Sequence, residues 1–317
     1  MMNPKISLFL LKMKSNIVVQ IPCLNEESTI GNVVKEFKKK LPSAKIIVYD
    51  NNSEDNSINL AKKNGADIIV VKKRGKGNVV RRMFEDNINA KYFIMIDADN
   101  TYDITNIKKN LFIMENESFD MMVAKRVHSD SLAYRKGHVF GNYVFSKFVR
   151  IIFGNDITDI FSGFRIFSKR FIKTFPQNSS EFEIEAELTI HALEQKNRVG
   201  EFECTYKARP SGSNSKLNTF KDGFKILKLI LILIKDEKPL FFFSIFSFLF
   251  LFLSLLIGIP IIHEFYLTGL VNRLPSAVLS GLLMVISFLC FFGGLILDVI
   301  KKIRYENKRI NFLLYKE

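Results

Sequence analysis

Two uncharged apolar runs near the C-terminus constrain the fold of this 317-residue chain more than any other feature. The first spans Phe241 to Ile262 and the second spans Leu274 to Leu297, so they are 22 and 24 residues long. A helix needs roughly 20 apolar residues to cross a bilayer, and a buried helix of a water-soluble protein rarely stays uncharged for so long. We therefore predict two transmembrane helices within residues 239–300, joined as a hairpin.

Basic residues flank this hairpin on both outer sides. Lys235 and Lys238 precede the first run, and five basic residues follow the second: Lys301, Lys302, Arg304, Lys308 and Arg309. Because cationic flanks stay in the cytoplasm, we expect a multi-pass protein of the cell (inner) membrane, with the domain that precedes the hairpin and both termini cytoplasmic. The net charge of +14 then favours the anionic lipid bilayer as a partner. We expect no nucleic acid, since no motif for binding it is present.

Short apolar segments alternate with helical ones through the first 124 residues. We predict strands at residues 17–21, 46–49, 68–71, 92–96 and 121–124. We predict helices at about residues 27–40, 55–64, 77–89 and 104–114. This alternation is typical of an α/β fold, in which a mostly parallel sheet has helices on both faces. Ligands of such sheets bind beyond the carboxyl ends of the strands.

Polar clusters follow the predicted strands at that edge, and the fourth strand runs directly into Asp97 and Asp99. Two carboxylates at a strand tip favour a divalent cation, and a hard cation with oxygen ligands suits a pyrophosphate. An isolated Asp-x-Asp usually marks a solvated loop. The pair therefore indicates a nucleoside diphosphate site only when it is read with the other clusters.

Four ordered segments together resemble glycosyltransferase family 2. They are Ile21–Glu27, Val48–Asp55, Asp97–Asp99 and Asp159–Arg165. The resemblance covers about residues 16 to 220 and implies the GT-A fold, a Rossmann-like mostly parallel sheet. The two apolar runs and the stretch from Tyr206 to Leu217 are similar to the subgroup of dolichyl-phosphate mannose synthase and the bacterial polyprenyl-phosphate glycosyltransferases.

The resemblance implies roles for individual residues. The nucleotide-binding set would be Pro22, Leu24, Glu26, Asp50, Lys76 and Asp97. Asp97 and Asp99 would hold Mg²⁺ or Mn²⁺ against the donor diphosphate. The catalytic set would be Asp159, Arg126, Arg135 and Arg165. The arginines would bind the acceptor phosphate or the donor diphosphate, because guanidinium groups pair with phosphate through two hydrogen bonds.

The role of Asp159 stays open between two alternatives. It is the obvious general base for an inverting displacement. A lipid phosphate, however, is already anionic near pH 7, since its second pKa is about 6. Asp159 would then organise the site instead, for example through Arg165.

The resemblance implies a membrane-anchored hexosyltransferase. It would move a sugar from a nucleotide sugar, UDP- or GDP-linked, to a polyprenyl phosphate, with undecaprenyl phosphate the expected form, by metal-dependent inverting displacement at the cytoplasmic face. Two alternatives are a polysaccharide-synthase-type family 2 enzyme and a catalytically dead membrane scaffold. The chain has no tryptophan and only two predicted spans, which argues against the synthase. The sugar, the base and a homo-oligomeric state stay open.

We predict five regions along the chain. They are an N-terminal extension (1–15), the catalytic domain (16–219), a juxtamembrane amphipathic helix (220–238), the two transmembrane helices (239–300) and a basic tail (301–317). The juxtamembrane helix is expected to be interfacial, lying on the membrane surface. A second amphipathic segment, His138 to Phe153, is either a core helix or an interfacial one. Glu183, Glu185 and Glu187 are expected to form a solvated helix start, with the alternative that one of them faces the pocket.

Overall fold

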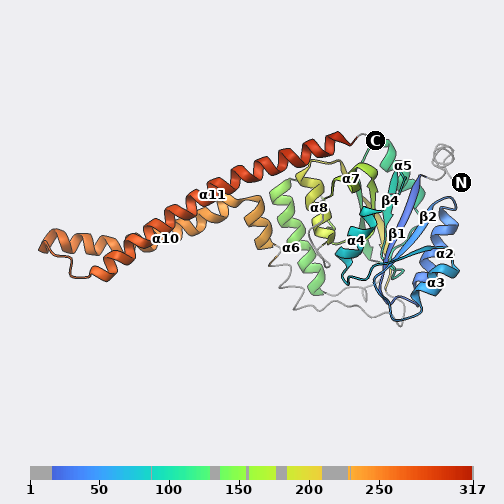
Figure 1. Cartoon of the computed structure of the whole chain (residues 1–317), viewed down its shortest axis with the longest axis horizontal. Coiled ribbons are helices and arrows are strands. Elements are labelled where there is room, and N and C mark those ends of the chain that lie inside the picture. Colours follow the sequence, from blue (N-terminus) through green and yellow to red (C-terminus); the bar gives the residue numbers. More distant parts are fainter. Residues whose placement is uncertain are drawn as a thin grey trace. The chain divides into compact units, whose positions relative to one another are not determined.

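The structure is a computed structural model, shown in Figure 1. It describes residues 16–86, 88–128, 136–154, 157–175, 184–208, 228 and 230–315. The predictions for residues 1–15, for Arg135 and for residues 209–227 lie outside the described residues. The chain divides into two compact units, residues 1–223 with 308–317, and residues 224–307.

The first unit is built on a seven-stranded sheet with the order β3-β2-β1-β4-β6-β5-β7. Its strands are β1 (Ile17–Cys23), β2 (Lys45–Asp50), β3 (Asp67–Val70), β4 (Tyr92–Met95), β5 (Met121–His128), β6 (Arg165–Ser168) and β7 (Val199–Tyr206). The β3-β2-β1-β4 half is parallel throughout, and β7 is parallel to β5. The predicted α/β class and mostly parallel sheet are confirmed.

Strand β6 is the antiparallel member, and it carries the last predicted motif to the site. It pairs with both β4 and β5 in the antiparallel sense, and Arg165 stands opposite Met95. The start of β6 therefore lies at the edge where β4 ends. The preceding residues 159–164 are brought to the same edge as Asp97.

Helices cover both faces of the sheet. The helices are α2 (Ile30–Lys40), α3 (Ser57–Lys63), α4 (Lys76–Glu85), α5 (Ile107–Asn116), α6 (Lys136–Phe153), α7 (Lys169–Thr174) and α8 (Ile184–Glu194). One buried cluster joins α2, α3 and α5 to residues such as Val19 of β1. The opposite cluster joins α4, α7 and α8 to residues such as Val18. Adjacent β1 residues face opposite sides, as the period of a strand requires.

The second unit contains two long apolar helices, α10 (Pro239–Thr268) and most of α11 (Leu274–Leu314). Both are long and apolar enough to cross a membrane by length and composition. Serine pairs join them: Ser254 Oγ donates to the Ser280 carbonyl at 2.8 Å, and Ser287 Oγ donates to the Ser247 carbonyl at 2.8 Å. Small polar residues of this kind let apolar helices approach closely.

Helix α11 continues beyond the predicted span, and its last turns belong to the first unit. Lys308 pairs with Glu194 of α8, and Arg309 donates to the Gln195 carbonyl at 2.8 Å. Phe312 is 2% exposed, and the Arg170 guanidinium lies 4.2 Å from its ring centroid. The segment expected to be a basic tail is therefore helical to Leu314, and residues 308–314 pack against α7 and α8.

Candidate active site

The loops after β1 and β2 are held together by hydrogen bonds. The Asn25 N–H donates to Ser53 Oγ at 2.9 Å, and Asn25 Oδ1 accepts from the Glu54 N–H at 2.8 Å. The Glu26 N–H donates to Ser57 Oγ at 2.9 Å. Asn25 and Asn52 adopt positive φ angles of 52° and 66°, which asparagine tolerates better than most residues. These contacts fix Leu24 and Glu26 beside the end of β2.

Asp50 ends β2 and is fully buried. Its Oδ2 accepts from the Ser53 N–H at 2.9 Å, whereas Oδ1 has no hydrogen-bond partner among the described residues. A buried acceptor without a partner is costly, so this oxygen is suited to a donor brought by a ligand. Pro22 and Cys23 stand opposite Tyr49 and Asp50 in the register of β1 with β2. The predicted nucleotide residues Pro22, Leu24, Glu26 and Asp50 therefore share one corner of the sheet edge.

Asn51 connects this corner to α4, a contact that the sequence did not reveal. Its Nδ2 donates to the carbonyls of Val71 and Lys73, and its Oδ1 accepts from the Gly75 N–H at 2.8 Å. A carboxylate has no proton to donate in the first two bonds, which explains why an amide stands at this position. Gly75 has φ of 119°, a backbone conformation that favours glycine. Asn51 and Gly75 together place Lys76 at the start of α4.

Lys76 lies between two carboxylates. Its Nζ is 2.5 Å from Asp97 Oδ1 and 2.5 Å from Glu185 Oε1. Burial opposes the charge on this amine, but Asp97 and Glu185 outweigh it and raise the pKa of Lys76. Glu185 is 4% exposed, so the expectation of a solvated glutamate is wrong at this position. The pairing itself was not predictable, because Lys76 and Glu185 lie more than one hundred residues apart in the chain.

Gly163 and Tyr102 hold the motif before β6 against Asp97. A Cβ atom on Gly163 would lie 2.1 Å from Asp97 Oδ2, so only glycine fits there. The Gly163 N–H donates to the Tyr102 hydroxyl at 2.9 Å. The Tyr102 ring makes edge contacts with Tyr206 and Phe164. Burial raises the pKa of Tyr102, which stays a neutral phenol.

Arg126 and Asp159 form a two-pronged ion pair. Arg126 Nε donates to Asp159 Oδ2 at 2.7 Å, Nη2 donates to Oδ1 at 2.7 Å, and the Arg126 backbone N–H donates to Oδ2 at 3.1 Å. The guanidinium carbon lies 5.5 Å from the ring centroid of Tyr206. Burial opposes the charge of Arg126, but Tyr102 and Asp159 raise its pKa. Both Asp159 oxygens accept from Arg126, which favours the organising alternative, acting through Arg126.

Glu201 on β7 fixes the turn that carries Asp159. Its Oε1 accepts from the backbone N–H groups of Thr158 at 2.7 Å and Asp159 at 3.0 Å. Its Oε2 accepts from the Thr158 hydroxyl at 3.0 Å. Glu201 was not among the predicted site residues, since no strand was predicted at residues 199–206.

Arg165 is placed differently from the other predicted residues. Its side chain is fully buried at the start of β6. Nε donates to the Ser162 carbonyl at 3.0 Å, Nη1 donates to Thr189 Oγ1 at 2.9 Å, and Nη2 donates to the Ile160 carbonyl. Burial lowers the pKa of Arg165 to about 10. These bonds hold the turn at residues 160–163 in place. The geometry therefore assigns Arg165 to positioning this turn, since its guanidinium group is buried beneath the turn and is not exposed to a phosphate.

Asp97 and Asp99 fit a divalent cation that shares a diphosphate. Asp99 is 3% exposed, and its Oδ1 accepts from Thr101 Oγ1 at 2.6 Å. Among the described residues no group of three or more His, Cys, Asp or Glu gathers as a metal site. Two carboxylates with further ligands from phosphate and water are a common arrangement for Mg²⁺. The chemistry of the donor set therefore fits, although Lys76 also contacts Asp97.

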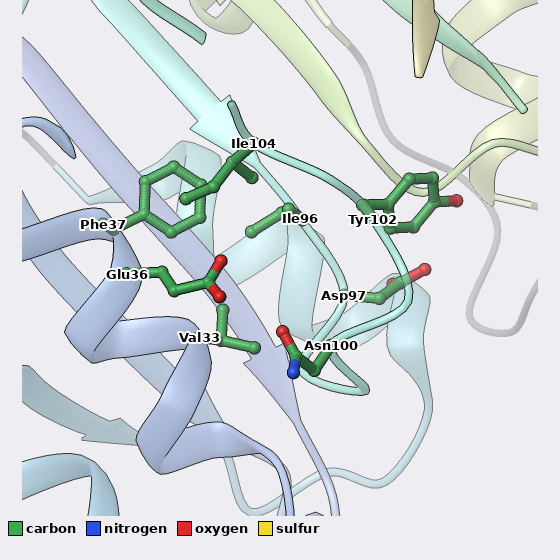
Figure 2. Close-up of a pocket in the computed structure, with 8 residues that line it drawn as sticks. All are labelled: Val33, Glu36, Phe37, Ile96, Asp97, Asn100, Tyr102 and Ile104. Atoms are coloured by element: carbon green, nitrogen blue, oxygen red, sulfur yellow. The ribbon is translucent and has the colours of Figure 1, made fainter. Parts of the chain in front are cut away.

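A small hollow lies behind Asp97, between α2 and residues 96–104 (Figure 2). Val33, Glu36 and Phe37 line it from α2, and Asp97 and Tyr102 lie at its other end. The hollow has almost no room for a water-sized sphere, so it is too small for a nucleotide sugar.

Sequence comparison links the chain to known proteins. Residues 18–175 match the model of the family described as glycosyl transferase family 2. The glycosyltransferase AglJ of Haloferax volcanii is 28% identical over 300 residues, covering 94% of this chain and 98% of that protein. A dolichyl-phosphate hexose transferase of the same organism is 22% identical over 223 residues, covering 70% and 96%. An uncharacterized protein of Shigella flexneri is 48% identical over 155 residues, covering 49% and 95%.

Solved structures with a similar fold are glycosyltransferases. Glucosyl-3-phosphoglycerate synthase of Mycobacterium tuberculosis superposes with a TM-score of 0.56 at 18% identity, covering 73% of this chain and 84% of that one. The same synthase in complex with Mn²⁺, UDP and glucosyl-3-phosphoglycerate gives a TM-score of 0.54. The predicted GT-A fold is confirmed. The sheet order, the carboxylates at the tip of β4 and the match to the family model all point to the same family. The chain belongs to glycosyl transferase family 2.

Proposed function

We propose that this enzyme transfers one hexosyl group from a nucleoside diphosphate sugar to a polyprenyl phosphate at the cytoplasmic face of the cell (inner) membrane. The observation that carries the proposal is the carboxylate pair at the tip of β4, in a chain that also has two helices apolar enough to span a membrane. The similarity to a dolichyl-phosphate hexose transferase supports a lipid phosphate as acceptor. Undecaprenyl phosphate is the form we expect.

The donor would lie across the ends of β1, β2 and β4. Asp50 Oδ1, which has no hydrogen-bond partner in the described part of the chain, would accept from an N–H of the base or an O–H of the ribose. Asp97 and Asp99 would hold Mg²⁺ or Mn²⁺, which neutralises the charge on the leaving diphosphate. The solved synthase complex with Mn²⁺ and UDP supports this assignment by analogy of fold. Lys76 would add a further positive charge beside the diphosphate.

The acceptor would be bound by Arg126, which Asp159 and Tyr206 hold in place. An oxygen of the lipid phosphate would attack the anomeric carbon as the bond from that carbon to the diphosphate oxygen breaks. The nucleoside diphosphate leaves with that electron pair, and the configuration inverts. The phosphate is already ionised near pH 7, so the step requires positioning and charge control rather than removal of a proton.

The orientation in the membrane is part of the proposal. Lys235 and Lys238 precede α10, and Lys301, Lys302 and Arg304 lie near the far end of the apolar part of α11. These positive flanks would hold both ends of the hairpin at the cytoplasmic surface. The catalytic unit would then face cytoplasmic nucleotide sugars while its acceptor phosphate lies at the lipid surface.

The full-length enzyme in lipid vesicles with Mn²⁺, radiolabelled UDP- or GDP-sugars and undecaprenyl phosphate tests the proposal. We expect label in the lipid phase with at least one donor, and a loss on the order of 100-fold for Asp97→Asn. Glu203→Gln, an exposed carboxylate on β7, should retain parental turnover. Labelled product on a water-soluble phosphate acceptor with none on the lipid would contradict the proposed acceptor.

A further inference from the structure

The ammonium of Lys76 has two partners from distant parts of the chain. Asp97 comes from the tip of β4, and Glu185 comes from the first turn of α8. The Glu185 side chain is 5% exposed and that of Lys76 is 13% exposed. One positive and two negative charges therefore lie together in a largely buried place. Asp97 is the most exposed of the three side chains, at 26%.

A metal ion and Lys76 compete for the same carboxylate. Lys76 Nζ already occupies Asp97 Oδ1, and Gly163 packs against Oδ2. A divalent cation beside Asp97 would repel the ammonium, since two positive charges a few ångströms apart interact strongly where water is largely excluded. Lys76 must then give up at least part of its pairing with Asp97.

Glu185 is a second ion-pair partner, which Lys76 can keep when its pairing with Asp97 is lost. A buried ammonium that loses its only partner is strongly destabilising, whereas one that retains a second carboxylate is not. Glu185 already contacts Lys76, so no new contact has to form. Glu185 also interacts electrostatically with the buried Arg165 guanidinium, so a second cation helps to hold its side chain near Lys76.

We propose that Glu185 is a positioning residue for donor binding: it retains the Lys76 ammonium when Asp97 turns from ion-pair partner to metal ligand. The proposal rests on the metal-dependent donor site proposed above. Before donor and metal bind, Lys76 serves as the cation beside Asp97. It then stands beside the diphosphate when the donor and metal enter.

A simpler effect of Glu185 must be separated from this one. Any carboxylate near a metal site strengthens metal binding through its negative charge alone, whether or not Lys76 is present. Under the proposal, Glu185 acts through Lys76, so its removal matters only while Lys76 is present. A double-mutant cycle distinguishes the two cases.

The experiment measures Mn²⁺ affinity of the full-length enzyme in detergent by electron paramagnetic resonance, with UDP or GDP present. Glu185→Gln should weaken Mn²⁺ binding at least tenfold, because Lys76 is then confined to Asp97. In the Lys76→Met background the same substitution should change the affinity less than twofold. Glu185→Asp should recover part of the affinity. Glu203→Gln is the matched control, and circular dichroism melting checks that each variant is folded.

Three results would overturn the inference. Unchanged or tighter Mn²⁺ binding in Glu185→Gln would rule out the positioning role of Glu185 and would leave the proposed function intact. Equal weakening with and without Lys76 assigns Glu185 a purely electrostatic role. Failure of the parental enzyme to bind Mn²⁺ with either nucleotide removes both this inference and the metal-dependent part of the proposed function.

Discussion

Gly163 lies directly against the carboxylate of Asp97, and a Cβ atom on it would come within 2.1 Å of Asp97 Oδ2. The motif before β6 thus sets the position of a group at the tip of β4. The carboxylate is confined between this backbone and Lys76. We expect Asp97 to be sensitive to small changes in a residue that makes no contact with substrate itself.

Gly163→Ala should therefore lower donor binding and turnover together. The added methyl forces Asp97 to move, and overpacking of this kind costs about 1–3 kcal/mol, which corresponds to roughly a 5- to 150-fold change. Titration with UDP and Mn²⁺, together with initial rates, measures the effect. Gly281→Ala adds the same methyl where nothing lies within 4 Å and serves as control. Parental nucleotide affinity in Gly163→Ala would show that Asp97 does not bind the donor through the metal.

Asp159→Asn should lower kcat on the order of 100-fold by releasing Arg126. The acidic limb of the pH–rate profile should keep its position in this variant. The acceptor phosphate, with a second pKa of about 6, sets that limb if Asp159 is an organiser. A limb that disappears in Asp159→Asn would identify Asp159 as the general base instead. Turnover within about threefold of the parent would remove it from the mechanism.

His191 should make the catalytic unit sensitive to mild acid. It is buried against Phe171 and Phe175, and burial, with the nearby charge of Lys308, lowers its pKa from 6.5 to about 3. Between these values the unfolded chain binds a proton that the folded chain does not, so stability falls as the pH drops below 6.5.

At pH 5 this effect amounts to up to about 2 kcal/mol. Melting of the full-length protein by circular dichroism at pH 7 and pH 5 measures it. His191→Phe keeps an aromatic ring and should reduce the acid-induced loss of melting temperature. An identical loss in both proteins would mean that another group causes the acid sensitivity.

The end of α11 should stabilise the catalytic unit. Phe312 is 2% exposed beneath Arg170, and replacing a buried phenylalanine with alanine costs about 3–5 kcal/mol. We expect Phe312→Ala to lower the melting temperature of this unit by roughly 6 °C or more. Leu314→Ala, at a residue 72% exposed, should have little effect. Equal melting of the two variants would show that residues 308–314 do not pack as described.

The first half of the sheet was predictable because its strands are short and fully apolar. The predicted strand at 92–96 is observed at Tyr92–Met95, and the one at 46–49 is observed at Lys45–Asp50. The apolar residues of these two strands are buried on both faces, so the apolar run marks each strand without ambiguity. The polar clusters at the strand ends followed from the same alternation.

The antiparallel strand and the buried charges were not predictable in the same way. Strand β6 has four residues, too few for a periodic pattern, and its direction depends on pairing with β4 and β5. From the sequence, Arg165 was expected to bind a phosphate and Glu185 to lie in a solvated helix start, whereas both side chains are buried. Their burial depends on partners such as Thr189 and Lys76, which only the folded chain brings near. Residues 209–227 and Arg135 lie outside the described residues, and the predictions made for them stand as predictions.

The most direct test of the account is the mass of the lipid product. The parental enzyme, in vesicles with Mn²⁺, undecaprenyl phosphate and its preferred nucleotide sugar, should yield undecaprenyl phosphate heavier by one hexose. Asp97→Asn should yield on the order of a hundredth of the parental amount, and Glu203→Gln should yield the parental amount. A ladder of several sugars, or no lipid product with any UDP- or GDP-sugar from a folded enzyme, would contradict the account.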